Sequence, residues 1–351
     1  MSEHVTVEQL ESFCVDALKA CEVGEDNARA TAARLVLTDS WGVFTHGSKL
    51  LIGYAKRLTG KGLKGNATPS IVREGPSWAL VDGGATLGQV TSTYAMQLAI
   101  DKAREAGTAY VGVRNSCHFG AAGVYANQAA QQGMIGMAMA NDVPSVAAPG
   151  SRKAVTGSNP IAYGVPTGGN PILLDMAIST VAGGKVFAAC ERGEPLPENW
   201  VIGPDGQPTT DGSQYPESAS LAPMAGYKGY GIALLIETLS AVLTGAAMTW
   251  NVGSWLFDDP SIETDHGGAF LAINVATLMP LEEFQRRMDG LVQEIHAAPK
   301  ADGSDRIYVP GEKEWEKREK ALKAGILLPS DVIQSLRRLS EHTGVPAPDW
   351  L

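Results

Sequence analysis

Two of the six histidines stand where a side chain could exchange a proton with a ligand. His46 lies in the run FTHGSKLL, at the predicted start of a helix, and His118 lies in RNSCHFGAAG, between a predicted strand and the next helix. An imidazole changes its charge near neutral pH, which suits proton transfer to or from a carbonyl or hydroxyl group. A capping residue or a hydrogen-bonded core histidine is the structural alternative for each. The glycine close to each one favours the approach of a ligand.

Asp175 and Lys228 could contact a ligand as well. Asp175 ends the apolar run PILLDMAIST, and a carboxylate in such a place is usually paired. It could orient a histidine, hold the ribose of a cofactor or cap the next segment. Lys228 opens the helix predicted in AGYKGYGIALLIE, where a helix N-terminus beside a lysine favours an anion such as a phosphate. The run TGSNPIAYGVP adds hydroxyl and amide donors.

Gly60, Gly62 and Gly65 spell the pattern G-x-G-x-x-G in RLTGKGLKG. That pattern indicates a dinucleotide-binding loop only where a strand precedes it and a helix follows it. Here residues 50–58 have helical spacing, and the NATPS that follows is typical of a loop. We therefore interpret these glycines as the end of a helix.

Other site chemistries are less well supported. His46, His118 and Asp175 could bind a metal, but the sequence contains neither H-x-H nor H-x-x-x-H, so we predict no metal site. A serine hydrolase is disfavoured because no G-x-S-x-G is present. A metal-dependent lyase or hydrolase that uses the same histidines remains the alternative from a different class.

Composition narrows the class of protein. The 351 residues are enough for about two domains, and a net charge of −10 disfavours nucleic acid as a partner. The four cysteines form no C-x-x-C pair, which predicts a reduced, cytoplasmic setting. The polar start MSEHVTVEQLESF does not resemble a signal peptide. The most apolar stretch, Tyr230 to Met248, contains Glu237, so we predict a buried helix there and no membrane partner.

The elements that must position these residues alternate in the middle of the chain and are helical at its ends. Thr6 and Gln9 form a predicted capping box for the first helix. The alternation from Trp78 onward predicts an α/β fold in which a parallel sheet is the favoured arrangement. The long segment from Glu191 to Ser220 is rich in Pro, Gly and Ser and is predicted to be a loop. Predicted strands are 78–83, 109–116, 134–142, 171–177 and 269–274; predicted helices are 89–106, 121–133 and much of the chain from 281 onward. The predicted domains are a helical segment 1–75, an α/β domain 76–284 and a second helical segment 285–351.

Eight runs of residues occur in an order that resembles a known family. They are THGSKLLIGYAKRL, NSCHFGAAGVYANQAAQQGMIG, GSNPIAYGVP, LLDMAIS with GGK, GQPTTD, YKGYGIALLIETLSAVLTG, FLAIN and YVPGEKEWEKREKALKAGI. The family is that of malate and L-lactate dehydrogenases, which also includes ureidoglycolate and sulfolactate dehydrogenases, diketogulonate reductases and cyclic imino-acid reductases. The resemblance extends from about residue 5 to residue 340 and is specific for the family but not for a substrate.

The resemblance implies an oxidoreductase that uses NAD or NADP and forms a homodimer. It also implies a mixed-sheet body that binds the cofactor, unlike the Rossmann fold, with a mainly helical domain built by both chain ends. His46 and His118 each match a histidine proposed as the acid or base, and Asp175 matches an aspartate beside the nicotinamide. The cofactor-binding residues implied by the resemblance are Asn141, Gly157, Ser158, Ile172, Leu173, Leu174, Asp175, Met176, Ala177, Tyr227, Lys228, Pro310, Gly311 and Glu312.

Departures from the family pattern concern the substrate. Thr45 stands where serine is usual and keeps a hydroxyl group. Leu50 stands where most members have an arginine that grips the substrate carboxylate, and Thr264 stands where some have a second one. Lys49 could supply a point charge instead, although it lies about 100° away around a helix. We therefore predict that Thr45 and Lys49 contact the substrate and that malate, lactate and ureidoglycolate are each doubtful substrates.

We predict reversible hydride transfer between a nicotinamide and a small 2-oxo or 2-hydroxy compound. His46 or His118 would move the proton, and Asp175 would fix the geometry. Reduction of a C=N bond in a cyclic or N-alkyl imino acid is the alternative within this class. A binding module that has lost catalysis is a third hypothesis, motivated by Leu50 and Thr264.

Overall fold

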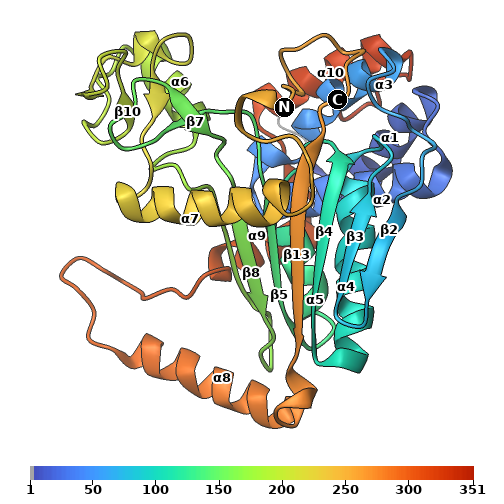
Figure 1. Cartoon of the computed structure of the whole chain (residues 1–351), viewed down its shortest axis with the longest axis vertical. Coiled ribbons are helices and arrows are strands. Elements are labelled where there is room, and N and C mark those ends of the chain that lie inside the picture. The colour runs from blue at the N-terminus through green and yellow to red at the C-terminus, as the bar shows by residue number, and fades with distance from the viewer. Residues whose placement is uncertain (1–3) are drawn as a thin grey trace.

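The computed structural model describes residues 4–351 and places a seven-stranded sheet at the centre of the molecule (Figure 1). Within this sheet, as residues 4–351 form it, β3 and β4 are the only parallel neighbours, and every other pair is antiparallel. In spatial order the strands are β2 (Ser70–Gly75), β3 (Trp78–Asp82), β4 (Thr108–Ser116), β13 (His266–Asn274), β5 (Met134–Ala140), β8 (Ile161–Val165) and β9 (Ile172–Met176).

The predicted α/β alternation is confirmed, but the favoured parallel sheet is wrong. Helix α4 (Gly88–Ala106) does connect the parallel strands β3 and β4. Strand β13 then inserts between β4 and β5, antiparallel to both, although it lies more than a hundred residues later in the chain. The local rhythm of strands and helices contains no information about such a distant strand, so the order could not be read from it.

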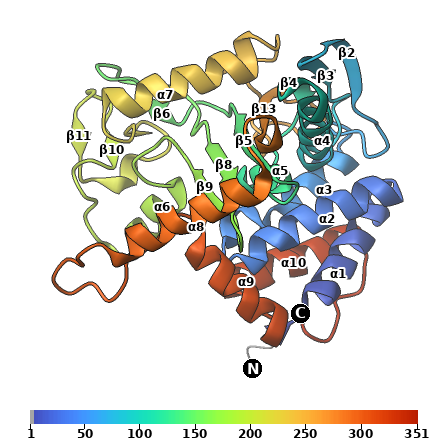
Figure 2. The same ribbon diagram turned by 90° about the horizontal axis from the view of Figure 1, so that it is seen from below.

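Strand β13 shows why the centre of the sheet is apolar on both faces. Phe270 and Ala272 pack in the core beneath α4 and α5 (Gly123–Ala130), whereas Ala269 and Leu271 pack against α7 (Tyr227–Glu237). Successive strand residues point to opposite faces, so one run supplies both cores. Figures 1 and 2 show α7 on one side of the sheet and the two other helices on the opposite side.

Helices from the two ends of the chain share one hydrophobic core. The predicted capping box of Thr6 and Gln9 is present, and β1 pairs antiparallel with β14. Helix α8 (Leu281–Ala297) lies apart at the other end of the sheet and buries none of its residues (Figure 1). The division of the chain into domains remains our interpretation. The elements of the shared core region are β1 (His4–Val5), α1 (Val7–Ala20), α2 (Glu25–Ser40), α3 (Leu51–Thr59), α9 (Glu312–Ala324), β14 (Ile326–Leu327) and α10 (Ser330–Thr343).

The segment predicted as a loop from Glu191 to Ser220 contributes to a second, five-stranded sheet with its own small core. Its strands are only two or three residues long, too short to give a recognisable alternation. In spatial order they are β11 (Pro208–Thr209), β10 (Val201–Ile202), β12 (Ser220–Leu221), β6 (Val146–Ala147) and β7 (Ala154–Thr156), accompanied by α6 (Gly183–Glu191). The short helical turns of the chain are η1 (Phe44–His46), η2 (Ser48–Leu50), η3 (Gly212–Gln214), η4 (Thr238–Val242), η5 (Thr249–Asn251) and η6 (Val275–Thr277).

The helix predicted to be buried between Tyr230 and Met248 is buried on one face, where Ala233 and Ile236 pack, but the prediction is wrong for its other face. Helix α7 ends at Glu237 and continues as the π-helical turn η4. Leu235 and Leu243 are 54% and 61% exposed, respectively. An apolar sequence predicts that a segment is shielded from water, but not whether the same chain or another molecule shields it. Within residues 4–351 no helix is both long and apolar enough to span a membrane.

Candidate active site

A cavity of about 460 Å³ brings His46, His118 and Asp175 together, although they are far apart in the sequence. His118 follows the end of β4, Asp175 lies in β9, and His46 ends the short turn η1. The wall is completed by residues after β5, at the start of β13 and before α9. Such a volume lies within the usual range of small-molecule sites.

His118 is held on three sides. Its Nδ1 lies 2.7 Å from the hydroxyl of Tyr54, and its ring stacks on Trp255 with centroids 4.4 Å apart. The backbone N–H of Gly120 also donates to Nδ1, at 3.4 Å. Because that N–H can only donate, Nδ1 accepts, and the neutral ring carries its proton on Nε2. Burial lowers the pKa of His118 to about 3, against the opposing charge of Asp142, so the ring is neutral at physiological pH.

Arg57 positions the segment that carries Trp255. Its guanidinium is buried and donates to the carbonyl oxygens of Trp255, at 2.8 Å, and Ile262, at 2.6 Å, and also to that of Ser254. The glycines that follow α3 support the same segment, since a Cβ at Gly60 would lie 2.6 Å from Pro260. The predicted helix end at these glycines is confirmed, and their smallness allows close packing beside the site.

The turn that presents His46 is built over a buried carboxylate. The N–H of Ser48 donates to Oδ2 of Asp39 at 2.9 Å, and a Cβ at Gly47 would lie 1.8 Å from Oδ1 of Asp39. Burial raises the pKa of Asp39 to about 7, and the Ser48 hydrogen bond opposes this shift. Glycine is therefore required next to His46 because the backbone lies directly against Asp39.

His46 itself is less enclosed than His118. Its Nδ1 lies 2.9 Å from the hydroxyl of Thr45, and the centroids of the two imidazole rings are 6.0 Å apart. Burial lowers the pKa of His46, and the negative charge of Asp142 opposes that shift. Nε2 of His46 makes no hydrogen bond to residues 4–351, so the cavity side of the ring is available to a ligand.

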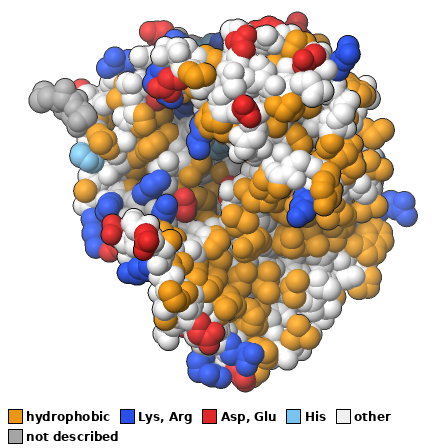
Figure 3. All heavy atoms as spheres, turned by 90° about the vertical axis from the view of Figure 1, so that its left-hand side faces the viewer, with side chains coloured by type: hydrophobic (Ala, Val, Ile, Leu, Met, Phe, Trp, Pro, Cys, Tyr) orange, Lys and Arg blue, Asp and Glu red, His pale blue; other side chains and the backbone are white. Residues whose placement is uncertain are grey.

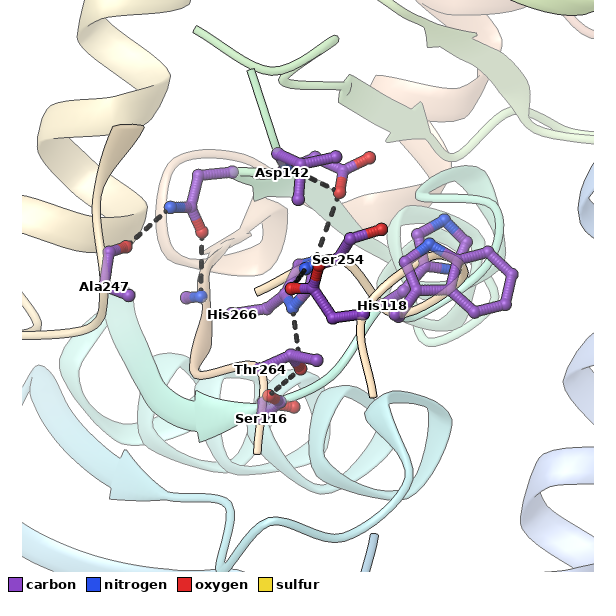
Figure 4. A network of polar contacts seen from close by, with 12 residues as sticks. Ser116, His118, Asp142, Ala247, Ser254, Thr264 and His266 are labelled. Carbon is purple, nitrogen blue, oxygen red and sulfur yellow. Dashed lines mark hydrogen bonds and ion pairs between the residues drawn. The ribbon is translucent and has the colours of Figure 1, made fainter. Parts of the chain in front are cut away.

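Sequence reasoning missed a third histidine in the cavity wall. His266, at the start of β13, lies with Nε2 3.1 Å from Oδ1 of Asp142 and with Nδ1 3.0 Å from the hydroxyl of Thr264 (Figure 4). Thr264 in turn donates to the carbonyl of Ser116 at 3.3 Å. Burial by itself raises the pKa of Asp142, but the hydrogen bond and charge of His266 outweigh it and lower the pKa. The runs that contain Asp142 and His266 show no spacing that links them.

Asp175 faces the cavity beside the first turn of α5. Its Oδ2 accepts the N–H of Gly123 at 2.7 Å, and a Cβ at Gly123 would lie 3.1 Å from the Asp175 side chain. Burial raises the pKa of Asp175 to about 6, the Gly123 hydrogen bond lowers it, and nearby Glu314 adds to the rise. The carboxyl group is therefore close to its titration range at neutral pH and is exposed to whatever fills the cavity.

Most of the predicted cofactor residues line the same cavity. Gly311 has a φ of +95°, and a Cβ there would lie 2.9 Å from the backbone nitrogen of Leu173, so only glycine permits this close approach. Gly157 does not line the cavity, but it packs against the backbone of Asp142 behind the wall. The predicted residues in the wall are Asn141, Ser158, Leu173, Leu174, Asp175, Met176, Ala177, Pro310 and Gly311.

Asn141 has its amide group engaged by the backbone. Its Nδ2 donates to the carbonyl of Ala247 at 2.8 Å, and its Oδ1 accepts the N–H of Gly267 at 2.8 Å. It therefore joins the end of β5 to the start of β13 and to the chain that follows η4. Its predicted contact with a cofactor remains a prediction.

Six predicted site residues lie outside the cavity wall. Lys49 is turned away from this cavity and pairs with Asp331 on α10 at 2.6 Å, so its predicted contact with the substrate gains no support from this geometry and stays a prediction. The helical rotation between positions 49 and 50 explains this direction. The other five belong to the predicted cofactor residues. Gly157 lies behind the wall, and Ile172 and Glu312 border an adjacent groove. Tyr227 and Lys228 are exposed at the start of α7.

The charges in the cavity are unusual for a site that binds an anion. Three carboxyl groups line it, those of Asp142, Asp175 and Glu314, and among the described residues no lysine or arginine does. Leu50 packs against the terminal helical core, and Thr264 is engaged by His266 and Ser116. Residues 4–351 also contain no group of three or more His, Cys, Asp or Glu side chains arranged to hold a metal ion.

Comparison with known proteins identifies relatives over almost the whole chain. Residues 5–337 match the family model described as malate/L-lactate dehydrogenase. A malate dehydrogenase from Pyrococcus abyssi is 38% identical over 96% of this chain and 94% of its own length. A ureidoglycolate dehydrogenase (NAD(+)) from Escherichia coli K12 is 33% identical over 91% of each chain. The crystal structure of malate dehydrogenase from Entamoeba histolytica superposes with a TM-score of 0.91 at 32% identity and covers 99% of both chains.

Proposed function

The chain belongs to the malate/L-lactate dehydrogenase family, and from this premise we propose that it transfers a hydride between NAD or NADP and a small 2-oxo or 2-hydroxy compound. The family makes the chain an oxidoreductase of the dehydrogenase and reductase class. The observation that carries the proposal is the meeting of His46, His118 and Asp175 in one cavity. Two groups for proton chemistry and one carboxyl group thus surround a space of the size that a small substrate needs.

The residues of the cavity fit a nicotinamide cofactor. The indole N–H of Trp41 and the hydroxyl of Ser116 are buried in the wall without a hydrogen-bond partner among the described residues, so each is free to bind a polar group. Gly311 and β9 approach each other closely and leave the backbone of 173–177 open to a flat ring. In the proposed complex, the nicotinamide supplies or accepts the hydride, Asp175 and this stretch hold it, and Lys228 binds phosphate.

The geometry favours His46 as the acid or base. Nε2 of His46 makes no hydrogen bond to the described residues and is free toward the cavity, whereas the His118 ring is fixed by Tyr54, Gly120 and Trp255. His118 stays neutral with its proton on Nε2, so it is suited to donate a hydrogen bond to the reacting oxygen. His46 would then take the hydroxyl proton during oxidation and return it during reduction.

We also propose that the chain forms a homodimer through the surface of α7 and η4. Figure 3, which views the molecule from the side of α7, shows a broad apolar surface, and a contiguous apolar surface is typical of an interaction site. Exposed hydrophobic side chains of α7, η4 and the residues after them are Leu234, Leu235, Val242, Leu243, Met248 and Trp250. A second copy of the chain would cover them.

The first test is a fluorescence titration with NADH and NADPH. Excitation of tryptophan with emission from the nicotinamide would report binding next to Trp41, which lines the cavity. Tight binding of one dinucleotide supports the proposal and decides between NAD and NADP, whereas no binding up to millimolar concentration contradicts it. Ketone and imine substrates assayed side by side then separate 2-oxo reduction from C=N reduction. Full activity after chelation would contradict the metal-dependent alternative.

A further inference from the structure

The cavity has an acceptor where an anionic substrate would need a donor. Oδ1 of Asp142 receives two hydrogen bonds, from Nε2 of His266 at 3.1 Å and from the N–H of Val143 at 2.8 Å. Oδ2 of Asp142 receives none from residues 4–351, and the side chain is 21% exposed within the cavity wall. One carboxylate oxygen is therefore fixed by the protein and the other is presented to the ligand.

The contacts of His266 fix the orientation of Asp142. Nδ1 of His266 lies 3.0 Å from the hydroxyl of Thr264, and that hydroxyl donates to the carbonyl of Ser116. Nε2 of His266 lies 3.1 Å from Oδ1 of Asp142, and a carboxylate oxygen can only accept, so Nε2 donates. This contact lowers the pKa of Asp142 and favours its ionised form.

Asp142 acts close to the proposed reacting groups. Its negative charge opposes the lowering of the pKa of both His46 and His118, so it shares their surroundings. Figure 4 shows His118 next to the pair of Asp142 and His266. No lysine or arginine of the described residues lines the cavity. Only the histidines could therefore offset a second negative charge on a ligand.

We propose that Asp142, held by His266, selects substrates that present an N–H or O–H donor to Oδ2 and rejects those that present a carboxylate there. This inference rests on the proposed function and specifies its substrate class. The substrate is a hydroxy or oxo compound that carries an amide, amine or second hydroxyl group beside the reacting carbon, rather than a dicarboxylate. A carboxylate at the same place would be desolvated next to a like charge, which costs binding free energy.

Three small compounds of nearly equal shape test this selection. Oxalate, oxamate and oxamide differ by successive replacement of a carboxylate oxygen by an NH₂ group. Their binding to the protein saturated with its preferred reduced dinucleotide is measured by the change in nicotinamide fluorescence. We expect the wild-type protein to bind oxamide or oxamate at least about tenfold more tightly than oxalate, a difference typical of one charge-dependent contact.

The variant Asp142→Asn keeps the size of the side chain and can still accept from His266, but it offers an NH₂ group to the cavity. We expect the preference against oxalate to disappear or to reverse. Asp302→Asn, in an exposed loop without a hydrogen bond to its carboxylate, is the matched control and should keep the wild-type order.

Dinucleotide binding without the small compounds separates the two proposals. If wild-type protein binds neither NADH nor NADPH, the proposed function fails and this inference fails with it. If a dinucleotide binds but oxalate binds most tightly, or none of the three compounds binds, or Asp142→Asn retains the wild-type order, only the selection by Asp142 is overturned.

Discussion

The histidine end of the cavity and the outer surface of α7 with η4 are built in opposite ways. His118 is enclosed by Tyr54, Trp255 and the segment that Arg57 holds. Side chains of the same chain therefore fix the position of its ring. The surface of α7 and η4 carries leucine and valine side chains that residues 4–351 leave between 43% and 61% exposed. The contacts of the first region are made within the described residues, whereas we propose that a second copy of the chain covers the other.

This difference separates a preorganised site from the surface through which we propose that the protein assembles. Desolvation lowers the pKa values of both histidines before any ligand arrives. An apolar surface of this kind instead contributes to stability only when another surface covers it. The site chemistry and the assembly of the protein can therefore be disrupted independently by substitutions in the two regions.

The largest expected effect comes from His46→Asn at the histidine end. Removing a general acid or base costs about 10²- to 10⁴-fold, so we expect kcat/KM to fall about a thousandfold, equal to about 4 kcal/mol. Because the pKa of His46 is lowered, alcohol oxidation by the wild-type protein should fall as pH drops through a value below 6.5. The variant should lose this limb of the profile.

His118→Asn is the comparison for that experiment. It removes the proposed hydrogen-bond donor, so a smaller loss of about a hundredfold is expected, with the acid limb retained. If His118→Asn loses the limb while His46→Asn keeps it, the two roles are exchanged.

The next effect concerns the pH dependence of folding stability, and it comes from Asp39, the buried carboxyl group beneath the turn that carries His46. The pKa of Asp39 is raised from 3.8 to about 7, so the folded state keeps a proton that the unfolded state releases between these pH values. Stability therefore falls as pH rises from 4 to 7, by at most about 4 kcal/mol for a shift of this size. Asp39→Asn cannot titrate and should remove this part of the decline, measured as the difference in free energy of unfolding in urea. Parallel pH curves for the two proteins would contradict it.

The prediction for the apolar surface is a change of assembly without a change in the fold. Leu243→Glu places a charge in the proposed interface and removes about 2 kcal/mol of apolar burial there. Sedimentation should show that the wild-type protein is a dimer and that the variant dissociates at micromolar concentration. Leu322→Glu, an exposed leucine of α9, is the control and should leave the dimer intact. A wild-type monomer would contradict the proposed interface.

Sequence reasoning located the site residues that sit at ends of regular elements. His118 at the end of β4 and Asp175 in β9 were recognisable because short apolar runs predict strands locally. The pairing of Asp142 with His266 was not, since it depends on β13 lying between β4 and β5. The exposed side of α7 was missed for a similar reason, because burial depends on which surfaces come together.

The smallest expected effect tests whether the enclosure of His118 contributes to catalysis as well as to packing. Tyr54→Phe removes the hydroxyl that donates to Nδ1, so the ring is held in its Nε2–H form only by the weaker Gly120 contact. One hydrogen bond contributes about 1 kcal/mol, so kcat should fall about fivefold to tenfold, with unchanged affinity for the dinucleotide. Tyr110→Phe, in β4 and outside the cavity wall, removes a comparable hydrogen bond to the carbonyl of Leu239 at 2.6 Å. It should cost similar stability and leave kcat unchanged. Equal losses of kcat in both variants would mean that Tyr54 only stabilises the fold. The enclosure of His118 would then serve packing and not catalysis.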